Sequence, residues 1–217
     1  YVSLVAQARD AWSGQVDVRL GLEADYFPGY EGWLDRQLSA HKFHYVLGSV
    51  HPQVAEYRKK YVHADPVATQ RTYFEMLATA AETGLFDCLS HPDLIKNETP
   101  EDWQPARIMP IIGKALDRIA ATGVAMELNT SGANKVIAEM NPFPAMLAEI
   151  RERAIPIVIG ADAHQPARVA DRYEMALDLL MEVGFTEVSL FLDRQRREIP
   201  IGVARSTLRS ESSAAAP

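Results

Sequence analysis

The chain has 217 residues, a net charge of −7 and a hydrophobic content of 47%, which is enough for one domain with a sizeable core. The negative charge argues against a nucleic-acid surface, and no apolar run approaches the roughly 20 residues needed to cross a bilayer. The single cysteine, Cys88, excludes an intramolecular disulfide and favours a reducing compartment. We therefore expect a soluble cytoplasmic domain that binds neither nucleic acid nor membranes.

Short runs of strand-forming residues alternate with stretches of helical spacing along most of the chain. The expected strands are residues 16–26, 44–51, 85–91, 123–129, 155–164 and 186–192. The expected helices are residues 31–42, 66–83, 105–122, 143–154 and 167–183. Asp65 before Pro66 is a favourable helix start, and Gly184 is a favourable helix end. This alternation predicts an α/β fold built on a parallel sheet or barrel.

The number of repeating units is small for a closed barrel. We count six strand–helix units, whereas a closed barrel commonly needs about eight. The chain also begins inside an expected helix, so we expect one or two N-terminal units to be missing from it. Residues 1–205 are interpreted as a single domain, and residues 206–217 as a disordered tail of small and polar residues.

Nearly every expected strand ends in a side chain able to bind a metal ion. In a barrel the C-terminal ends of the strands converge on one mouth, where the chemistry takes place. A purely structural core gives no reason for carboxylates and imidazoles at the same end of successive strands. These residues are Glu23, Asp25, His51, His91, Glu127, Asn129, Asp162 and His164.

The motif GADAH places Asp162 and His164 two residues apart at a strand end. Residues at this spacing share one face of a strand, so both side chains can point into one site. A carboxylate with an imidazole suits Zn²⁺, Mn²⁺ or Fe²⁺. The alternative is an Asx-turn that precedes a helix.

Glu23, His51 and His91 are the other candidate metal ligands. Glu23 lies within an apolar run, and a buried carboxylate requires a cationic partner, either a metal or a salt-bridge partner. His51 and His91 each follow an expected strand, and either histidine alone could be structural. Together with the Asp162 and His164 pair, they favour a metal cluster.

Two further segments offer groups for an anionic substrate. The loop that starts at Asn129 has hydrogen-bond donors and a flexible backbone that suit an oxyanion, although it could equally cap the next helix. Arg194 follows the last expected strand and could meet a phosphate, although a solvated basic run is the alternative.

Five motifs together resemble the histidinol-phosphate phosphatase branch of the PHP superfamily. The similarity extends from about Val16 to Pro200 and implies a distorted, TIM-like (β/α)₇ barrel. It also implies up to three divalent metal ions, Zn, Mn or Fe, at the C-terminal ends of the strands. The motifs are GLEADYFPG at 21–29, GSVH at 48–51, SHPDLIK at 90–96, ELNTSG at 127–132 and GADAH at 160–164.

The resemblance also implies a role for each candidate ligand. Glu23 would bridge two metal ions, and His51 and His91 would bind the second of them. Asp162 would bind the first metal and His164 the third, which makes these two the expected catalytic residues. The His-x-His motif that opens the family's sequence is absent here, so this chain is expected to assemble only part of the cluster and to be inactive alone.

Three residues are expected to bind the substrate. Arg194 matches an arginine that holds the substrate phosphate in the family. Lys135 follows Asn134 where the family often has an Arg-Lys pair, and Asn129 belongs to the shared ELNTSG motif.

The function that the resemblance implies is metal-dependent hydrolysis of a small phosphorylated metabolite. Histidinol phosphate would be converted to histidinol in histidine biosynthesis. One alternative is a PHP phosphoesterase that acts on nucleic acid or nucleotides. Another is a binding module whose metal site is catalytically incomplete.

Overall fold

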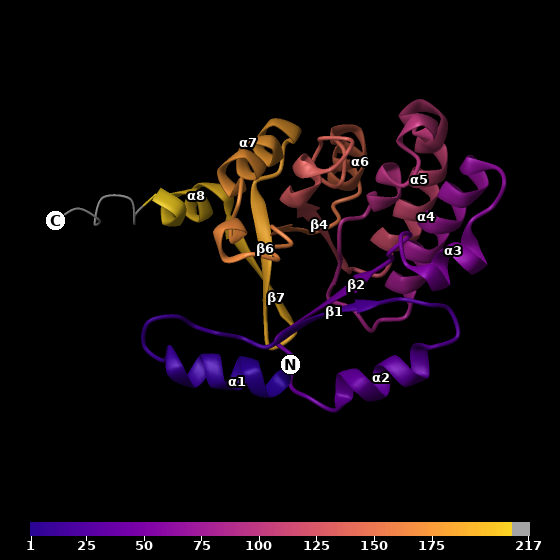
Figure 1. Cartoon of the computed structure of the whole chain (residues 1–217). Helices are drawn as coiled ribbons and strands as arrows, with labels where there is room; N and C mark the ends of the chain where they lie inside the picture. The colour runs from indigo at the N-terminus through magenta and orange to yellow at the C-terminus, as the bar shows by residue number, and fades with distance from the viewer. Residues whose placement is uncertain (210–217) are drawn as a thin grey trace.

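A computed structural model describes residues 1–209 of the chain (Figure 1). The α-helices are α1 (Val2–Ala11), α2 (Glu31–Ser39), α3 (Ala55–Tyr61), α4 (Pro66–Glu82), α5 (Pro105–Ala120), α6 (Pro144–Glu152), α7 (Tyr173–Val183) and α8 (Ile201–Arg209). The strands are β1 (Gly21–Asp25), β2 (Tyr45–Ser49), β3 (Cys88–Leu89), β4 (Ala125–Asn129), β5 (Ile157–Gly160), β6 (Glu187–Leu192) and β7 (Gln195–Pro200). The short 3₁₀ helices are η1 (Leu94–Asn97), η2 (Pro100–Asp102), η3 (Thr130–Asn134) and η4 (Pro166–Arg168).

Strands β1 to β5 form one parallel sheet in sequential order. Each pair of neighbouring strands is joined through at least one α-helix, as parallel pairing requires. All five strands therefore end at the same edge of the sheet. The predicted α/β fold with a parallel sheet is confirmed, whereas closure into a seven-unit barrel is not shown by the described residues.

The expected sixth strand does not join this sheet. Strand β6 instead pairs antiparallel with β7 and forms a separate two-stranded sheet. The connection is only Asp193 and Arg194, which have φ values of 54° and 63°. A two-residue turn with both φ values positive joins antiparallel strands. The assignment of residues 186–192 to another parallel unit was therefore wrong.

The helix ends follow the local signals in the sequence. The Asp65 side chain accepts a hydrogen bond from the backbone nitrogen of Val67, and Gly184 ends α7 with a φ of 100°. Helices α3 and α8 were not predicted. Residues 206–209 of the expected disordered tail belong to α8, and residues 210–217 lie outside the described part of the chain.

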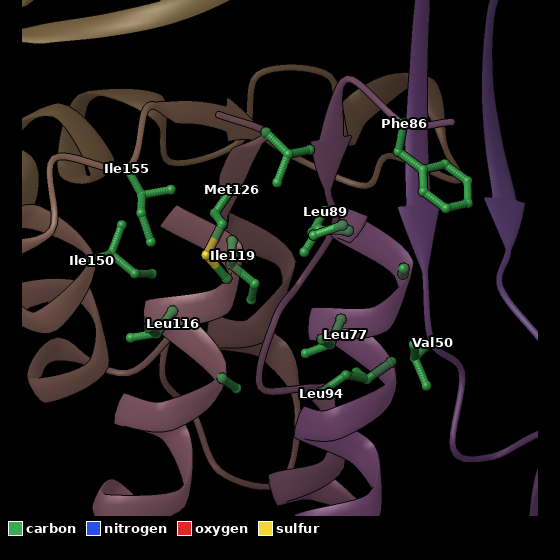
Figure 2. Packing of buried hydrophobic residues seen from close by; sticks show 14 of the residues in the cluster. Val50, Leu77, Phe86, Leu89, Leu94, Leu116, Ile119, Met126, Ile150 and Ile155 are labelled. Atoms are coloured by element: carbon green, nitrogen blue, oxygen red, sulfur yellow. The ribbon is translucent and has the colours of Figure 1, made fainter. Parts of the chain in front are cut away.

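The main hydrophobic core lies between the sheet and helices α4, α5 and α6 (Figure 2). Leu89 and Met126 project from the sheet towards these helices. Their buried partners on the three helices are Leu77, Leu116, Ile119 and Ile150. Since strand side chains alternate between faces, the neighbours of Leu89 and Met126 in sequence point the other way. That opposite face carries Cys88, Ala125 and Glu127, and the candidate site lies on it.

Close packing also fixes the position of β2 against the core. A methyl group added to Gly48 would lie 2.5 Å from the ring of Phe86, so only glycine fits there. Cys88 is fully buried beside this region, and burial raises the pKa of its thiol. None of the described helices is long and apolar enough to span a membrane.

Arg194 ties the β6–β7 hairpin to the amino-terminal end of the parallel sheet. Its Nε lies 2.7 Å from Oδ1 of Asp87, and its Nη2 donates to the carbonyl of Leu85 at 2.8 Å. Its backbone nitrogen donates to the carbonyl of His44. Asp87 is buried and immediately precedes β3, so the arginine compensates a buried negative charge.

We predict that Arg194→Ala lowers the free energy of unfolding by about 1–3 kcal/mol, because Asp87 loses its cationic partner. Urea denaturation followed by circular dichroism measures the change. Arg197→Ala is the matched control, since Arg197 is exposed on the same hairpin. Equal stability of the two variants would contradict this structural role for Arg194.

Candidate metal centre

Glu23, His51 and His91 come together at the carboxyl-terminal edge of the sheet. Glu23 lies in the middle of β1, His51 follows β2, and His91 follows β3. One potential ligand atom from each side chain lies within 4.8 Å of the other two. The side chains originate from three neighbouring strands, so the parallel register itself brings them together.

The two imidazoles converge on a single carboxylate oxygen. Oε1 of Glu23 lies 3.1 Å from Nε2 of His91 and 3.5 Å from Nε2 of His51. The hydroxyl of Ser49 donates to the same oxygen at 2.6 Å. Two nitrogens and an oxygen that face one point are a donor set typical of zinc and of related divalent metals. The residues present therefore fit a divalent metal ion.

Asp25 supports the orientation of His51. The Nδ1 atom of His51 contacts Oδ1 of Asp25, and this contact turns Nε2 towards Glu23. Metal-binding histidines in proteins usually have such a carboxylate partner, which fixes the tautomer of the ring. Asp25 lies two residues after Glu23 on β1 and therefore shares its face of the strand.

Electrostatic effects keep Glu23 ionised. Burial raises the pKa of Glu23, but hydrogen bonds from His91 and Ser49 and the positive charge of the histidines outweigh it and lower the pKa to about 2. For His51 burial acts in the opposite direction and lowers the pKa, because it disfavours the charged imidazolium. The hydrogen bond and charge of Asp25 outweigh burial, so the pKa of His51 is raised. The site thus stabilises a carboxylate next to positive charge, which a metal ion would also provide.

Asp162 borders the same site, whereas His164 does not. Asp162 and Glu23 line one cavity of about 280 Å³, and Oδ2 of Asp162 accepts a hydrogen bond from the Ser131 hydroxyl at 3.3 Å. The His164 side chain is 85% exposed, and its Nδ1 lies 3.0 Å from the carbonyl oxygen of Asp162. Among the described residues, His164 does not join the Glu23, His51 and His91 group.

Arg194 lies at the wrong edge of the sheet for the phosphate role expected of it. Its partners His44 and Asp87 precede β2 and β3, whereas His51 and His91 follow these strands. The stretch from residue 44 to residue 51 corresponds to roughly 20 Å at the usual rise of a strand. The hairpin connection after β6, which the sequence did not reveal, turns Arg194 towards Asp87. The expected phosphate contact is therefore corrected to a structural one.

Asn129 is buried and its amide group is already engaged. It is 1% exposed, its Nδ2 donates to Oε2 of Glu127 at 2.9 Å, and its Oδ1 accepts from the backbone nitrogen of Ser131 at 2.9 Å. This second bond caps η3, which is the alternative that the sequence left open for this loop. The structure therefore does not present Asn129 as a free donor for a substrate.

Lys135 lines a second cavity, next to the first one, together with a residue that the sequence did not single out. This cavity has a volume of about 310 Å³ and is also lined by Asp162, His164 and Arg168. The Nε of Arg168 lies 3.0 Å from Oδ2 of Asp171, and its buried Nη2 has no hydrogen-bond partner. A single arginine in a stretch of helical spacing does not indicate an anion-binding site in the sequence.

Glu127, which sequence analysis named only among the strand-end groups able to bind a metal ion, lies outside the Glu23, His51 and His91 group. Burial raises the pKa of Glu127, although nearby His91 and Asn129 favour its charged form. Gly160 on the adjacent strand β5 makes room for it, because a methyl group on Gly160 would overlap with Oε1 of Glu127. Its place near the end of an expected apolar strand was the signal that the sequence offered.

Comparison with known proteins identifies the family. Residues 1–131 match the family model of the PHP domain, which is more than half of the chain. The chain belongs to the PHP domain family. This PHP domain is 36% identical over 190 residues to a probable histidinol-phosphatase of Deinococcus radiodurans, and the alignment covers 85% of this chain and 72% of that relative.

Solved structures share the fold of this PHP domain. A crystal structure of histidinol phosphate phosphatase from Lactococcus lactis, complexed with Zn, L-histidinol and phosphate, has a TM-score of 0.73 at 18% identity. The match covers 91% of this chain and 78% of that one. A putative histidinol phosphatase of Listeria monocytogenes has a TM-score of 0.68 at 20% identity over 81% of this chain and 74% of that one.

We predict that Gly160→Ala destabilises the PHP domain by about 1–3 kcal/mol, because the added methyl group forces Glu127 out of its buried position. Thermal and urea denaturation measure the change. Gly202→Ala is the control, since no atom lies within 4 Å of a methyl group added there. A Gly160→Ala chain as stable as the control would show that Glu127 is not packed against Gly160.

Proposed function

We propose that this PHP domain is a metal-dependent phosphomonoesterase whose substrate is histidinol phosphate. The observation that supports this most strongly is the convergence of Glu23, His51 and His91 on one point, with Asp162 on the wall of the same cavity. The 36% identity to a probable histidinol-phosphatase supports the substrate assignment. Zinc is the expected ion, and Asp162 and His164 are proposed to extend the site to as many as three ions.

The bound metal would supply a Lewis acid that polarises the phosphoryl group and activates water. The chain's own residues would hold it in place: Glu23, His51 and His91 would offer the ligand atoms, and Asp25 orients the His51 ring. The wall of the cavity beside these residues includes the apolar side chains of Val158 and Leu47.

We further propose that the substrate phosphate lies in the second cavity, between Lys135 and Arg168. Both side chains line this cavity, no ion pair of Lys135 occurs among residues 1–209, and the buried Nη2 of Arg168 lacks a hydrogen-bond partner. Asp171 holds the Arg168 guanidinium in position through Nε. Two cations beside Asp162 favour a dianionic group next to the metal site. Arg168 thus takes the role that the sequence suggested for Arg194.

The sheet is proposed to be part of the distorted (β/α)₇ barrel of PHP enzymes. The outer edge of β1 pairs with no other strand among the described residues. A strand added at this edge would lie beside Glu23 and could contribute further ligands. The structural similarity to the Lactococcus lactis enzyme, which extends over 78% of that chain, supports this arrangement of the fold.

We predict that Glu23→Gln abolishes stoichiometric zinc binding and lowers phosphate release from L-histidinol phosphate at least about 100-fold, because the carboxylate that faces both imidazoles loses its charge. Elemental mass spectrometry of zinc-loaded protein and a phosphate-release assay measure these effects. Glu56→Gln, an exposed change on α3, is the control.

Three outcomes separate the candidate functions. Zinc binding with turnover, both lost in Glu23→Gln, supports the proposal. Zinc binding without turnover of L-histidinol phosphate indicates a binding module or an enzyme with another substrate. Release of nucleotides from single-stranded DNA would identify a nucleic-acid substrate. Wild-type zinc content in Glu23→Gln would contradict the metal site itself.

We also predict that Arg168→Ala raises the KM for L-histidinol phosphate by about 10-fold or more, since one charge-assisted bond to phosphate is lost. Arg168→Lys should restore part of the affinity, and Arg71→Ala, an exposed change on α4, should have no effect. Steady-state kinetics at saturating zinc measure KM and kcat separately. An unchanged KM in Arg168→Ala would exclude this phosphate site.

A further inference from the structure

A continuous series of hydrogen bonds connects His91 to Asp162 through strand β4. The backbone nitrogen of His91 donates to Oε2 of Glu127 at 2.9 Å, and Nδ2 of Asn129 donates to the same oxygen at 2.9 Å. Oδ1 of Asn129 accepts from the backbone nitrogen of Ser131 at 2.9 Å, and the Ser131 hydroxyl donates to Oδ2 of Asp162 at 3.3 Å. The series starts at one candidate metal ligand and ends at another.

The order of the strands explains why β4 can carry this connection. Strand β4 lies between β3, which leads to His91, and β5, which leads to Asp162. Glu127 and Asn129 are two residues apart, so both point to the face of the sheet on which the candidate site lies. Ser131 follows in η3 and reaches across the end of β5. The motif ELNTSG therefore spans the gap between the two flanking ligands.

Burial makes these hydrogen bonds important. Glu127 is 5% exposed, Asn129 1% and Ser131 9%. Buried polar groups require partners, and losing one partner costs more than the bond contributes in water. At one end Glu127 holds the backbone of His91, which has an unusual positive φ of 21°. At the other end Asp162 is also held in a left-handed conformation, with a φ of 47°.

We propose that Glu127, Asn129 and Ser131 are positioning residues that fix His91 and Asp162 relative to each other before metal binding. The proposal builds on the proposed function, because it takes both end residues as metal ligands. It assigns the motif ELNTSG to the organisation of the metal site and not to contact with the substrate. A preformed pair of ligands binds metal more tightly, because less ordering accompanies binding.

Ser131→Ala is the most selective test, because it removes the hydroxyl that reaches Asp162 and keeps the backbone bond to Asn129. We expect zinc affinity, measured by competition with a chromogenic chelator, to fall about 10-fold or more. Ser131→Thr retains a hydroxyl and should restore most of the affinity. Ser39→Ala, at the exposed end of α2, is the matched control and should bind zinc like the wild type.

Glu127→Met tests the other end of the series with little change in side-chain length. Its thioether cannot replace the oxygen that accepts from both His91 and Asn129, so zinc affinity should again fall about 10-fold or more. Circular dichroism verifies that each variant is folded. Wild-type zinc affinity in both Ser131→Ala and Glu127→Met would overturn the proposal.

Kinetics at saturating zinc separate this role from a substrate contact. A positioning role predicts that Ser131→Ala keeps the wild-type KM for L-histidinol phosphate once the site is filled. A raised KM together with unchanged zinc affinity would overturn the proposal in favour of a substrate contact. If the wild type binds zinc but releases no phosphate, the proposed function fails, while the affinities still decide the positioning role.

Discussion

The candidate site depends on one interaction: the Glu23 carboxylate, which is 37% exposed and not buried as its apolar run suggested, faces positive charge. The two imidazoles that meet Oε1 provide it, at 3.1 Å for His91 and 3.5 Å for His51. The parallel register of β1 with β2 and of β2 with β3 is what delivers the three side chains to one point. The fold and the site are thus consequences of the same strand pairing.

Much of this arrangement could be predicted from the sequence, because it depends on local signals. The strand–helix alternation predicted the parallel sheet, and the Asp65-Pro66 and Gly184 signals marked helix ends that the structure contains. Successive expected strands contain or precede Glu23, His51 and His91. Since parallel strands end at one edge of the sheet, this placement predicted that the three side chains lie close together.

The errors arose where long-range packing decides the outcome. The β6–β7 hairpin depends on positive φ values at Asp193 and Arg194. Glycine and asparagine commonly indicate such a turn, whereas an arginine rarely does. That turn carries Arg194 to Asp87, away from the site. Similarly, the contribution of Arg168 depends on the path of the chain after GADAH, and the role of Glu127 depends on its neighbour Gly160. No periodic pattern in the sequence predicts any of these contacts.

The central claim is that Glu23, His51 and His91 bind a divalent metal together. Its most direct test is a crystal structure of the zinc-loaded protein with anomalous data collected at the zinc absorption edge. The account predicts an anomalous peak about 2.0–2.3 Å from Nε2 of both histidines and from a Glu23 oxygen. A peak confined to other residues, such as the exposed His164, or no peak within bonding distance of Glu23, would contradict it.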